Sequence, residues 1–228
     1  MFIRVWVLMA IVLLATAAQA KDSEYKTDKQ RFSYAIGVQI GGSIQRDGLD
    51  VDAEIIGQAI GDVLSKETLR VSPEDMQAAF AAVKDRKVKE MEAIAETNLK
   101  AGQEFMAKFG KEKGVKTLDD GIQYKVLQKG SGKKPTETDT VVVNYRGTKI
   151  DGTEFDSSYK RGEPATFGVN AVIKGWQEIL PMMPTGSKWQ VVIPSALAYG
   201  PQGTGGPIGP NDTLIFDIEL LEIKQPAQ

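Results

Sequence analysis

The sequence predicts an α+β protein in which an all-helical N-terminal part precedes a C-terminal twisted antiparallel β-sheet wrapped over one short helix. Three observations support this prediction. From residue 27 to about residue 113 the apolar residues recur every three or four positions, which is the period of helices. After Gly114 they recur every second position, which is the period of strands. Residues 172–180 interrupt that alternation, and we expect the short helix there.

The composition narrows the chemistry that the chain can perform. The 228 residues are 25% charged and 42% hydrophobic with a formal net charge of -2, which is typical of a globular protein of one or two domains. Histidine and cysteine are both absent. This excludes a Ser-His-Asp triad, a cysteine nucleophile, a disulfide and a zinc site built on imidazole or thiolate. We expect no cofactor and no metal site, and the mixing of basic with acidic residues does not favour a nucleic-acid partner.

Residues 1–20 have the pattern of a secretory signal peptide. Arg4 is followed by an apolar run from Val5 to Ala15 and by a small-residue cleavage site that ends at Ala20. The run is too short to span a bilayer, and we expect no membrane span in the mature chain. Cleavage would export the protein, to the periplasm in the first place, with the outer surface or secretion as alternatives. An uncleaved anchor is the competing interpretation.

Two short helices and one long helix are predicted before Gly114. The short ones cover about residues 27–48 and 52–65, and they must pack on something because helices of this length are marginal alone. Ser72-Pro73-Glu74-Asp75 is a strong start for the third, with a capping serine and proline at the first helical position. Continued to about Lys113, it would be roughly 60 Å long. Much of it should therefore stand in solvent.

We expect residues 21–114 to form a dimerisation module with a stalk helix, through which two chains make a homodimer. The apolar stripe of the long helix lapses at Lys87 and Asn98, which argues against a continuous coiled coil. An alternative function is a holding chaperone, with a cleft between the stalks that binds unfolded chains. Adaptable methionines and phenylalanines would suit such a surface. They are Met76, Phe80, Met91, Phe105 and Met106.

Residues 115–228 are expected to form the sheet domain. Alternating runs begin at Ile122, Val141, Trp189 and Leu214, and segments rich in glycine and proline separate them. Between the second and third runs lies Val172-Ile173-Lys174-Gly175-Trp176. A glycine next to a tryptophan is typical of a sharp turn into a short helix that leaves the indole as a platform.

We predict that the indole of Trp176 is the floor of a small apolar pocket. Its walls would be aromatic and aliphatic, with the carboxylate of Asp156 as one of few polar groups. The predicted wall residues are Phe155, Phe167, Tyr199, Ile208 and Phe216. The alternative interpretation is that Trp176 is only a core residue.

Several motifs, in order and at compatible spacing, resemble the FK506-binding-protein (FKBP) type of peptidyl-prolyl cis-trans isomerase. They are Val141–Gly147, Asp151–Ser158, Val172–Trp176, Ala198–Gly200 and Leu214–Asp217. The resemblance covers about residues 117–223. The helical N-terminus is similar to that of the exported bacterial Mip/FkpA group, with Tyr34-Ala35-Ile36-Gly37 and Gly114–Leu118 as local matches.

The resemblance implies an enzyme that rotates X-Pro bonds in unfolded or exported polypeptides, with macrolides such as FK506 and rapamycin as inhibitors. Chemistry and composition agree. The rotation faces a barrier of about 18–20 kcal/mol but breaks no bond, so it needs no nucleophile. Water stabilises the polar, planar amide, and a dry aromatic pocket therefore favours the twisted, less dipolar form.

The resemblance also implies roles for individual residues. The proline ring would lie on Trp176, enclosed by Tyr145, Phe155, Val172, Ile173 and Phe216. Tyr199 would donate its hydroxyl to a substrate carbonyl, and the backbone N–H of Ile173 would bind a neighbouring carbonyl. Asp156 would face the twisting amide carbonyl, steadied by the Tyr145 hydroxyl and by Arg161. Taken singly, each has a simpler interpretation: Tyr145 and Phe216 as core residues, Asp156 as a turn cap and Arg161 as a surface charge.

Other features carry less weight. Where many family members have a second pocket phenylalanine, this chain has Ala165, with Phe167 two positions later. Gly130-Ser131-Gly132-Lys133-Lys134 does not have the glycine spacing of a phosphate-binding loop. Asn211-Asp212-Thr213 is a glycosylation sequon, which has meaning only in a cell with that machinery.

Overall fold

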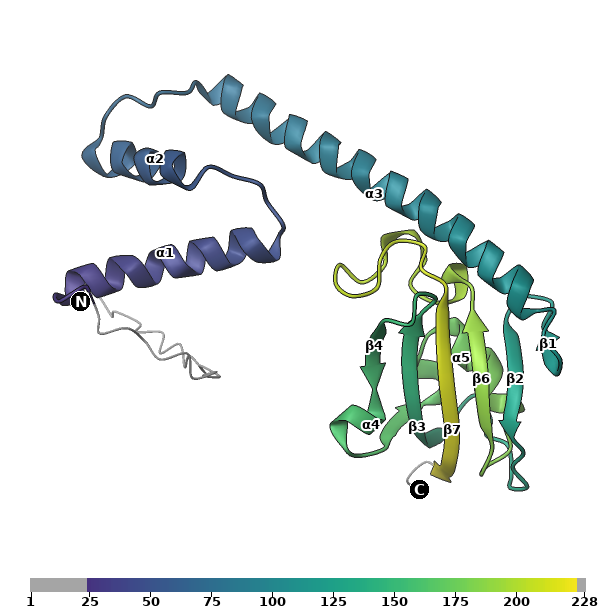
Figure 1. The fold of residues 1–228 in the computed structure, drawn as a ribbon. Helices are drawn as coiled ribbons and strands as arrows, with labels where there is room; N and C mark the ends of the chain where they lie inside the picture. Colours follow the sequence, from purple (N-terminus) through teal and green to yellow (C-terminus); the bar gives the residue numbers. More distant parts are fainter. Residues whose placement is uncertain (1–23, 225–228) are drawn as a thin grey trace. The chain divides into compact units, whose positions relative to one another are not determined.

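The computed structural model describes residues 24–224, as a helical region followed by an antiparallel sheet with a short helix. This confirms the predicted α+β class. The chain divides into two compact units, and the second begins at Pro73 (Figure 1). The predicted signal peptide lies outside the described residues. No helix within residues 24–224 is long and apolar enough to cross a membrane.

The first unit contains helices α1 (Asp28–Arg46) and α2 (Ala53–Ser65), which confirms both short helices. Thr27 caps α1: its hydroxyl accepts from the N–H of Gln30 at 3.2 Å, and the Gln30 side chain accepts from the N–H of Thr27 at 3.1 Å. Asp52 caps α2 in a similar way. No residue of α1 is buried in the single chain, and α2 buries only Asp62, which forms an ion pair with Arg70.

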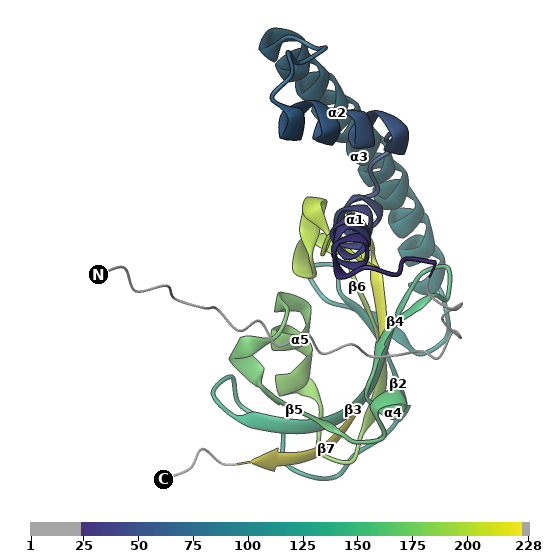
Figure 2. The same ribbon diagram turned by 90° about the vertical axis from the view of Figure 1, so that its left-hand side faces the viewer.

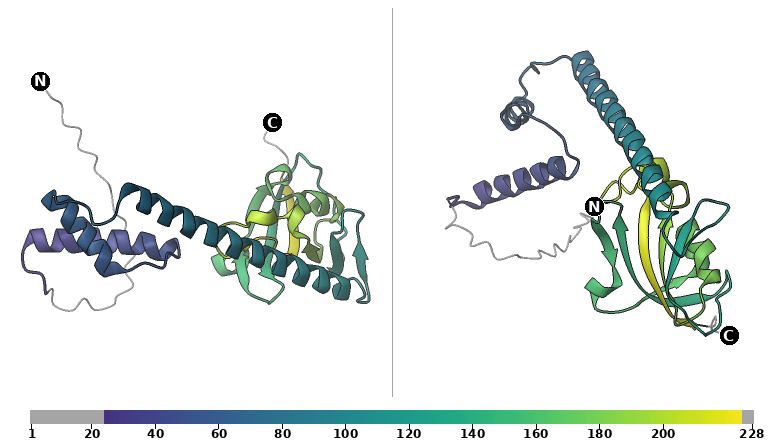
Figure 3. Two further views of the ribbon diagram at one scale, coloured as in Figure 1. Left: turned by 90° about the horizontal axis from the view of Figure 1, so that it is seen from above. Right: turned by 45° about the vertical axis from the view of Figure 1, so that its right-hand side comes forward.

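The second unit opens with helix α3 (Pro73–Phe109). It ends about four residues before the predicted Lys113, because the chain turns through residues 110–114 and reaches Gly114 at φ 87°, a conformation that glycine adopts easily. Its N-terminal part is largely exposed, whereas its C-terminal part packs beside the strands (Figure 3). The covered positions repeat every three or four residues. They are Ala95, Asn98, Ala101, Gly102, Phe105, Met106 and Phe109.

Antiparallel pairing joins seven strands into one sheet. The strands are β1 (Val115–Thr117), β2 (Gln123–Gln128), β3 (Thr140–Lys149), β4 (Glu154–Ser157), β5 (Ala165–Gly168), β6 (Lys188–Ile193) and β7 (Leu214–Lys224). Their order is β1-β2-β6-β7-β3-β4, and β5 also pairs with β3. The four predicted runs are β2, β3, β6 and β7. Strands β1, β4 and β5 have three or four residues, too few for an alternating pattern to be recognised.

Helix α5 (Lys174–Ile179) lies against the concave face of the sheet, as predicted (Figure 2). A turn of 3-10 helix, η2 (Leu180–Met182), follows it. Gly175 allows the close approach, because a Cβ atom there would lie 2.5 Å from Cγ2 of Ile193 on β6. The core between helix and sheet contains aliphatic, aromatic and methionine side chains. Its fully buried members include Ile122, Val141, Val143, Ile179, Leu180, Met183, Val191, Leu214, Ile218 and Leu220.

Short helical segments complete the unit and border the site described next. Helix α4 (Ser158–Arg161) directly follows β4. Three turns of 3-10 helix are η1 (Val169–Ala171) before α5, and η3 (Ser195–Leu197) and η4 (Gly200–Gln202) in the loop between β6 and β7.

Candidate active site

A cavity of about 450 Å³ opens at one end of the concave face. Its lining comes from β3, β4, β5, β7, helix α5 with the segment leading into it, and the loop after β6. The lining residues are Tyr145, Phe155, Asp156, Phe167, Ala171, Val172, Ile173, Trp176, Tyr199 and Phe216. All of them except Ala171 were predicted as site residues. Ala171, in η1, has no sequence signal, since it is a small residue in a turn.

Three aromatic rings meet the indole of Trp176 edge-on. The ring centroids of Tyr145, Phe167 and Phe216 lie 5.3, 5.8 and 5.3 Å from it, at interplanar angles of 89°, 90° and 84°. Edge-to-face packing is a favoured arrangement of aromatic pairs and holds each ring in place. Trp176 is only 3% exposed, yet it lines the cavity. It is therefore both a core residue and a wall of the pocket, which unites the two interpretations of the sequence.

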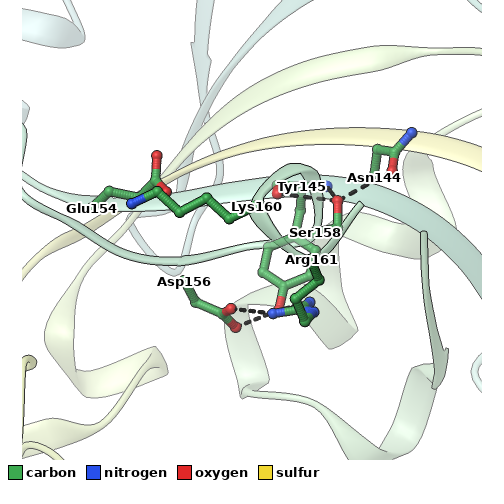
Figure 4. A network of polar contacts seen from close by, with 7 residues as sticks. All are labelled: Asn144, Tyr145, Glu154, Asp156, Ser158, Lys160 and Arg161. Atoms are coloured by element: carbon green, nitrogen blue, oxygen red, sulfur yellow. Dashed lines mark hydrogen bonds and ion pairs between the residues drawn. The ribbon is translucent and has the colours of Figure 1, made fainter. Parts of the chain in front are cut away.

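Asp156 on β4, Tyr145 on β3 and Arg161 at the end of α4 form one polar network (Figure 4). The Tyr145 hydroxyl donates to one carboxylate oxygen of Asp156, and the Arg161 guanidinium donates to the other. Arg161 also donates to the Tyr145 hydroxyl at 3.0 Å. With both oxygens held, the orientation of the carboxylate at the cavity wall is fixed. Arg161 does not line the cavity and touches it only through these two partners.

A buried serine holds this network at a gap in the sheet. Strand β4 pairs with β3 at residues 146–148 and β5 pairs with it at residues 140–143, so residues 144 and 145 lack a strand partner on that side. The fully buried Ser158 replaces the strand: its hydroxyl accepts from the N–H of Tyr145 at 2.9 Å and donates to Asn144 at 3.1 Å. Ser158 thereby satisfies the backbone N–H of Tyr145, a member of the Asp156 network. Sequence reasoning missed Ser158, although it lies in the Asp151–Ser158 motif.

Glu154 holds the same segment through a second set of polar contacts, and Figure 4 shows it beside Lys160. Its carboxylate forms ion pairs with Arg146 on β3 at 2.6 Å and with Lys160 on α4 at 3.0 Å. Strand β4 and helix α4, which carry Asp156 and Arg161, are thus fixed to β3 by two separate sets of polar contacts.

The ionisation of these groups follows from their contacts. Burial raises the pKa of Asp156, but the hydrogen bonds from Tyr145 and Arg161 and the positive charge of Arg161 outweigh it, and the pKa lies below its ordinary 3.8. Burial, and then the hydrogen bond to Asp156, raises the pKa of Tyr145 above 10.0. Burial and the charge of Asp156 do the same to the pKa of Tyr199. At neutral pH the cavity therefore holds one carboxylate and two protonated hydroxyls.

These shifts predict an activity that does not depend on pH between about pH 5 and about pH 9. Because the pKa of folded Asp156 is lowered, its contribution to stability is fully present above its unfolded pKa and is lost as pH falls through the folded value. The measurement is kcat/KM for a proline peptide in an assay without a coupling protease, with thermal unfolding followed in the same buffers. An inflection between about pH 6 and about pH 8 would contradict the assignment.

Most predicted site residues lie where the sequence indicated. Phe155 packs edge-on against Phe216, with centroids 5.7 Å apart, and Tyr199 is 42% exposed at the rim. Ile208 is the exception: it is 4% exposed, packs in the hydrophobic core and does not line the cavity. The loop that carries it folds back on itself through a hydrogen bond from the N–H of Thr204 to the carbonyl of Ile208 at 3.0 Å. The prediction that Ile208 lines the pocket considered only that it is an aliphatic residue near the other wall residues, and it did not include the folding back of this loop.

Comparisons with known proteins cover both parts of the chain. Residues 131–221 match the family described as FKBP-type peptidyl-prolyl cis-trans isomerase, and residues 29–126 match the domain amino terminal to that isomerase. The chain is 42% identical over 219 residues to the outer membrane protein MIP of Legionella longbeachae, with 94% of each chain covered. It is 42% identical over 220 residues to FkpA of Escherichia coli K12, named as an FKBP-type peptidyl-prolyl cis-trans isomerase, with 92% of this chain and 81% of FkpA covered.

A solved structure agrees with these relatives. The crystal structure of FkpA from Escherichia coli superimposes with a TM-score of 0.66 at 41% identity, covering 88% of this chain and 98% of that one. The likeness extends through the helical region as well as the sheet domain, as the resemblance of the motifs implied. The chain belongs to the FKBP-type peptidyl-prolyl cis-trans isomerases, and it is a rotamase of the Mip and FkpA kind.

Proposed function

We propose that the cavity over Trp176 is where this isomerase rotates X-Pro bonds, and that its substrates are proline-containing segments of unfolded, exported polypeptides. The observation that carries the proposal is an aromatic cavity whose polar wall includes one carboxylate held on both oxygens and the hydroxyl of a partly exposed tyrosine. Macrolides of the FK506 and rapamycin type would compete for the same cavity. The reaction uses the chain's own side chains and backbone alone.

The aromatic walls act on the amide itself. In water, rotation faces a barrier of about 18–20 kcal/mol and takes tens of seconds or more, because resonance keeps the bond planar. The proline ring lies on the indole of Trp176, and Tyr145, Phe155 and Phe216 enclose it. Val172 and Phe167 extend the apolar wall. This exclusion of water removes the stabilisation of the planar, dipolar amide and lowers the barrier.

The polar groups select the twisted form. As the bond rotates, the nitrogen lone pair leaves resonance and the carbonyl carbon becomes more positive, so a carboxylate beside it interacts more favourably with the transition state than with the ground state. Asp156 supplies that carboxylate. The hydroxyl of Tyr199 and the N–H of Ile173 donate to carbonyls on either side of the proline. They hold the peptide while one end turns.

We further propose that the protein is exported and acts as a homodimer. The signal-peptide pattern of residues 1–20 supports export, to the periplasm in the first place. Dimerisation is supported by the many exposed apolar side chains of the first unit, which a partner chain would cover. They include Phe32, Tyr34, Val38, Ile55, Val63 and Leu64.

A holding-chaperone activity is the second candidate. Phe80 is 77% exposed and Met91 is 43% exposed, both on α3, so these predicted client-binding residues are available in the single chain. Phe105 and Met106 are half-buried where α3 packs beside the sheet, and they contribute less to such a surface. The cleft between the two stalks would therefore be lined by the N-terminal part of α3.

The two activities are separated by comparing Tyr199→Phe in the full chain with a chain that starts at Pro73. The cut is placed there because α3 packs on the isomerase unit. Loss of one neutral hydrogen bond in Tyr199→Phe, about 0.5–1.5 kcal/mol, should slow a proline-limited refolding reaction about two- to ten-fold while protection from aggregation survives.

The shortened chain should be monomeric and should isomerise short peptides but lose that protection. Full-rate isomerisation by Tyr199→Phe would refute the role of this hydroxyl, and a dimeric shortened chain would refute the dimerisation module.

A further inference from the structure

The loop between β6 and β7 is fastened to helix α3 by two hydrogen bonds that run in opposite directions. The side-chain amide of Asn98 on α3 donates to the carbonyl of Pro210 at 2.9 Å, and the side-chain amide of Asn211 donates to the carbonyl of Ala95 at 3.3 Å. All four groups are partly shielded from water. We call Asn98, Asn211 and these contacts the α3 brace.

The packing around the α3 brace is close enough to be specific. A Cβ atom at Gly102 would lie 2.2 Å from the Thr213 hydroxyl, and one at Gly209 would lie 3.3 Å from the Asn98 amide. Gly102 is buried, so the close approach of the loop explains a glycine in the interior of a helix, where alanine is normally the more stable residue. Asn98 is one of the two polar residues that interrupt the apolar stripe of α3. The structure explains this interruption, because the Asn98 amide forms a hydrogen bond where α3 contacts the loop.

The same loop carries Tyr199. The backbone N–H of Asn211 donates to the carbonyl of Gly200 at 2.9 Å, which closes the neck of the loop one residue after Tyr199. Asn211 has φ 56°, a left-handed conformation that asparagine tolerates better than most residues. Its backbone therefore clamps the loop and its side chain joins the clamp to α3.

The loop needs an external support. Between Tyr199 and Asn211 it contains several glycines, and Gly200, Gly203 and Gly205 have φ values of 63°, 62° and 69°. Fixing each residue of such a segment costs conformational entropy, and glycine loses more of it than other residues. Helix α3 packs on the sheet and forms hydrogen bonds with residues 210 and 211 of the loop. It therefore limits the freedom of the part of the loop that lies nearest the cavity.

We propose that Asn98 and Asn211 are positioning residues of the isomerase, through which α3 holds the Tyr199 loop at the rim of the cavity. This rests on the proposed role of Tyr199 as a donor to the substrate. Loss of the brace leaves the Tyr199 side chain chemically unchanged, but its hydroxyl would be found less often at the position from which it donates to the substrate. The effect should therefore fall on substrate binding, as a higher KM, more than on kcat. The amide of Asn211 is engaged with α3, so the sequon of which it is part has this structural use.

The test uses the full chain with Asn211→Gly and Asn98→Asp. Glycine at 211 keeps the positive φ and the backbone hydrogen bond but removes the amide, and aspartate at 98 is isosteric but cannot donate. Gln103→Ala is the matched control, because it removes an exposed amide from the same helix. We expect KM for a proline peptide to rise about three- to ten-fold in both variants with kcat changed less than about two-fold. Amide hydrogen exchange in residues 199–206 should accelerate about ten-fold, with no change around Ser158.

A double variant distinguishes the failure of this inference from the failure of the proposed function. If the brace acts through Tyr199, then Asn211→Gly should have little further effect on KM in a Tyr199→Phe background. Unchanged KM in Asn211→Gly and Asn98→Asp, or an equally large added effect in the double variant, would overturn the positioning role. The single Tyr199→Phe variant reports separately on the proposed function: if it binds and isomerises normally, the hydroxyl is not a donor to the substrate.

Discussion

Replacement of Asp156 by alanine is expected to lower kcat/KM for a proline peptide about ten- to hundred-fold while the fold is retained. Hydrogen bonds and contacts that involve a charged group contribute about 1.5–3 kcal/mol, and each 1.4 kcal/mol corresponds to a factor of ten in rate. The side chain of Asp156 is 42% exposed, so its removal leaves no cavity in the core. Peptide isomerisation and thermal unfolding, measured on the same preparation, check both parts of the prediction.

Two further variants show whether charge is the cause. Asp156→Asn keeps the shape and an acceptor oxygen but removes the negative charge, and it should lose most of the activity that alanine loses. Asp151→Ala removes an exposed carboxylate from the neighbouring turn and should leave kcat/KM unchanged. An asparagine variant with full activity would show that the carboxylate does not act by its charge.

Replacement of Gly175 by alanine is expected to destabilise the protein and to impair the cavity together. Helix propensity alone predicts a gain of about 1 kcal/mol, since alanine is the better helix former. Packing predicts a loss of stability instead, because the new Cβ would lie 2.5 Å from Cγ2 and 2.8 Å from Cδ1 of the fully buried Ile193. Overpacking in a core costs about 1–3 kcal/mol, and the strain should prevail. The shift of α5 would also displace the adjacent Trp176.

A double-mutant cycle with Ile193→Ala provides the control. Ile193→Ala alone should cost about 2–5 kcal/mol through the cavity that it creates, and the added methyl group at position 175 should then be accommodated. The free energies of unfolding should therefore be clearly non-additive. If Gly175→Ala were as stable as the parent chain, or if the two changes added independently, the close packing of α5 on β6 would be refuted.

Much of the fold could be predicted because its signals are local. The caps at Thr27 and Asp52 mark α1 and α2, and the change from helical to alternating period locates the long strands. Tyr145, Phe155 and Phe216 were given their roles in the pocket through the order of the motifs that contain them, whereas Phe167 lies outside those motifs. The dimerisation module and the exact division between stalk and isomerase domain stay predictions.

What could not be predicted depends on tertiary contacts. Ser158 acts at a gap in the edge of β3, and the gap exists only because β4 and β5 stop short of each other. Ile208 is buried because its loop folds back, which its composition does not reveal. Asn98 interrupts an apolar stripe, and nothing in the sequence indicated that its amide binds a carbonyl 112 residues away. The side chains of Ser158 and Asn98 each satisfy a backbone group of a distant segment, whereas the fold-back at Ile208 is made by a hydrogen bond between two backbone groups.

The central claim is that the aromatic cavity over Trp176 itself lowers the barrier to X-Pro rotation. It is tested most directly by measuring the cis–trans exchange rate of a proline peptide with the full chain, without and with saturating FK506. We expect rapid exchange that is abolished when one macrolide is bound per chain and that is slowed in Asp156→Ala. Exchange that continued at the full rate while the macrolide occupied the cavity would contradict the account.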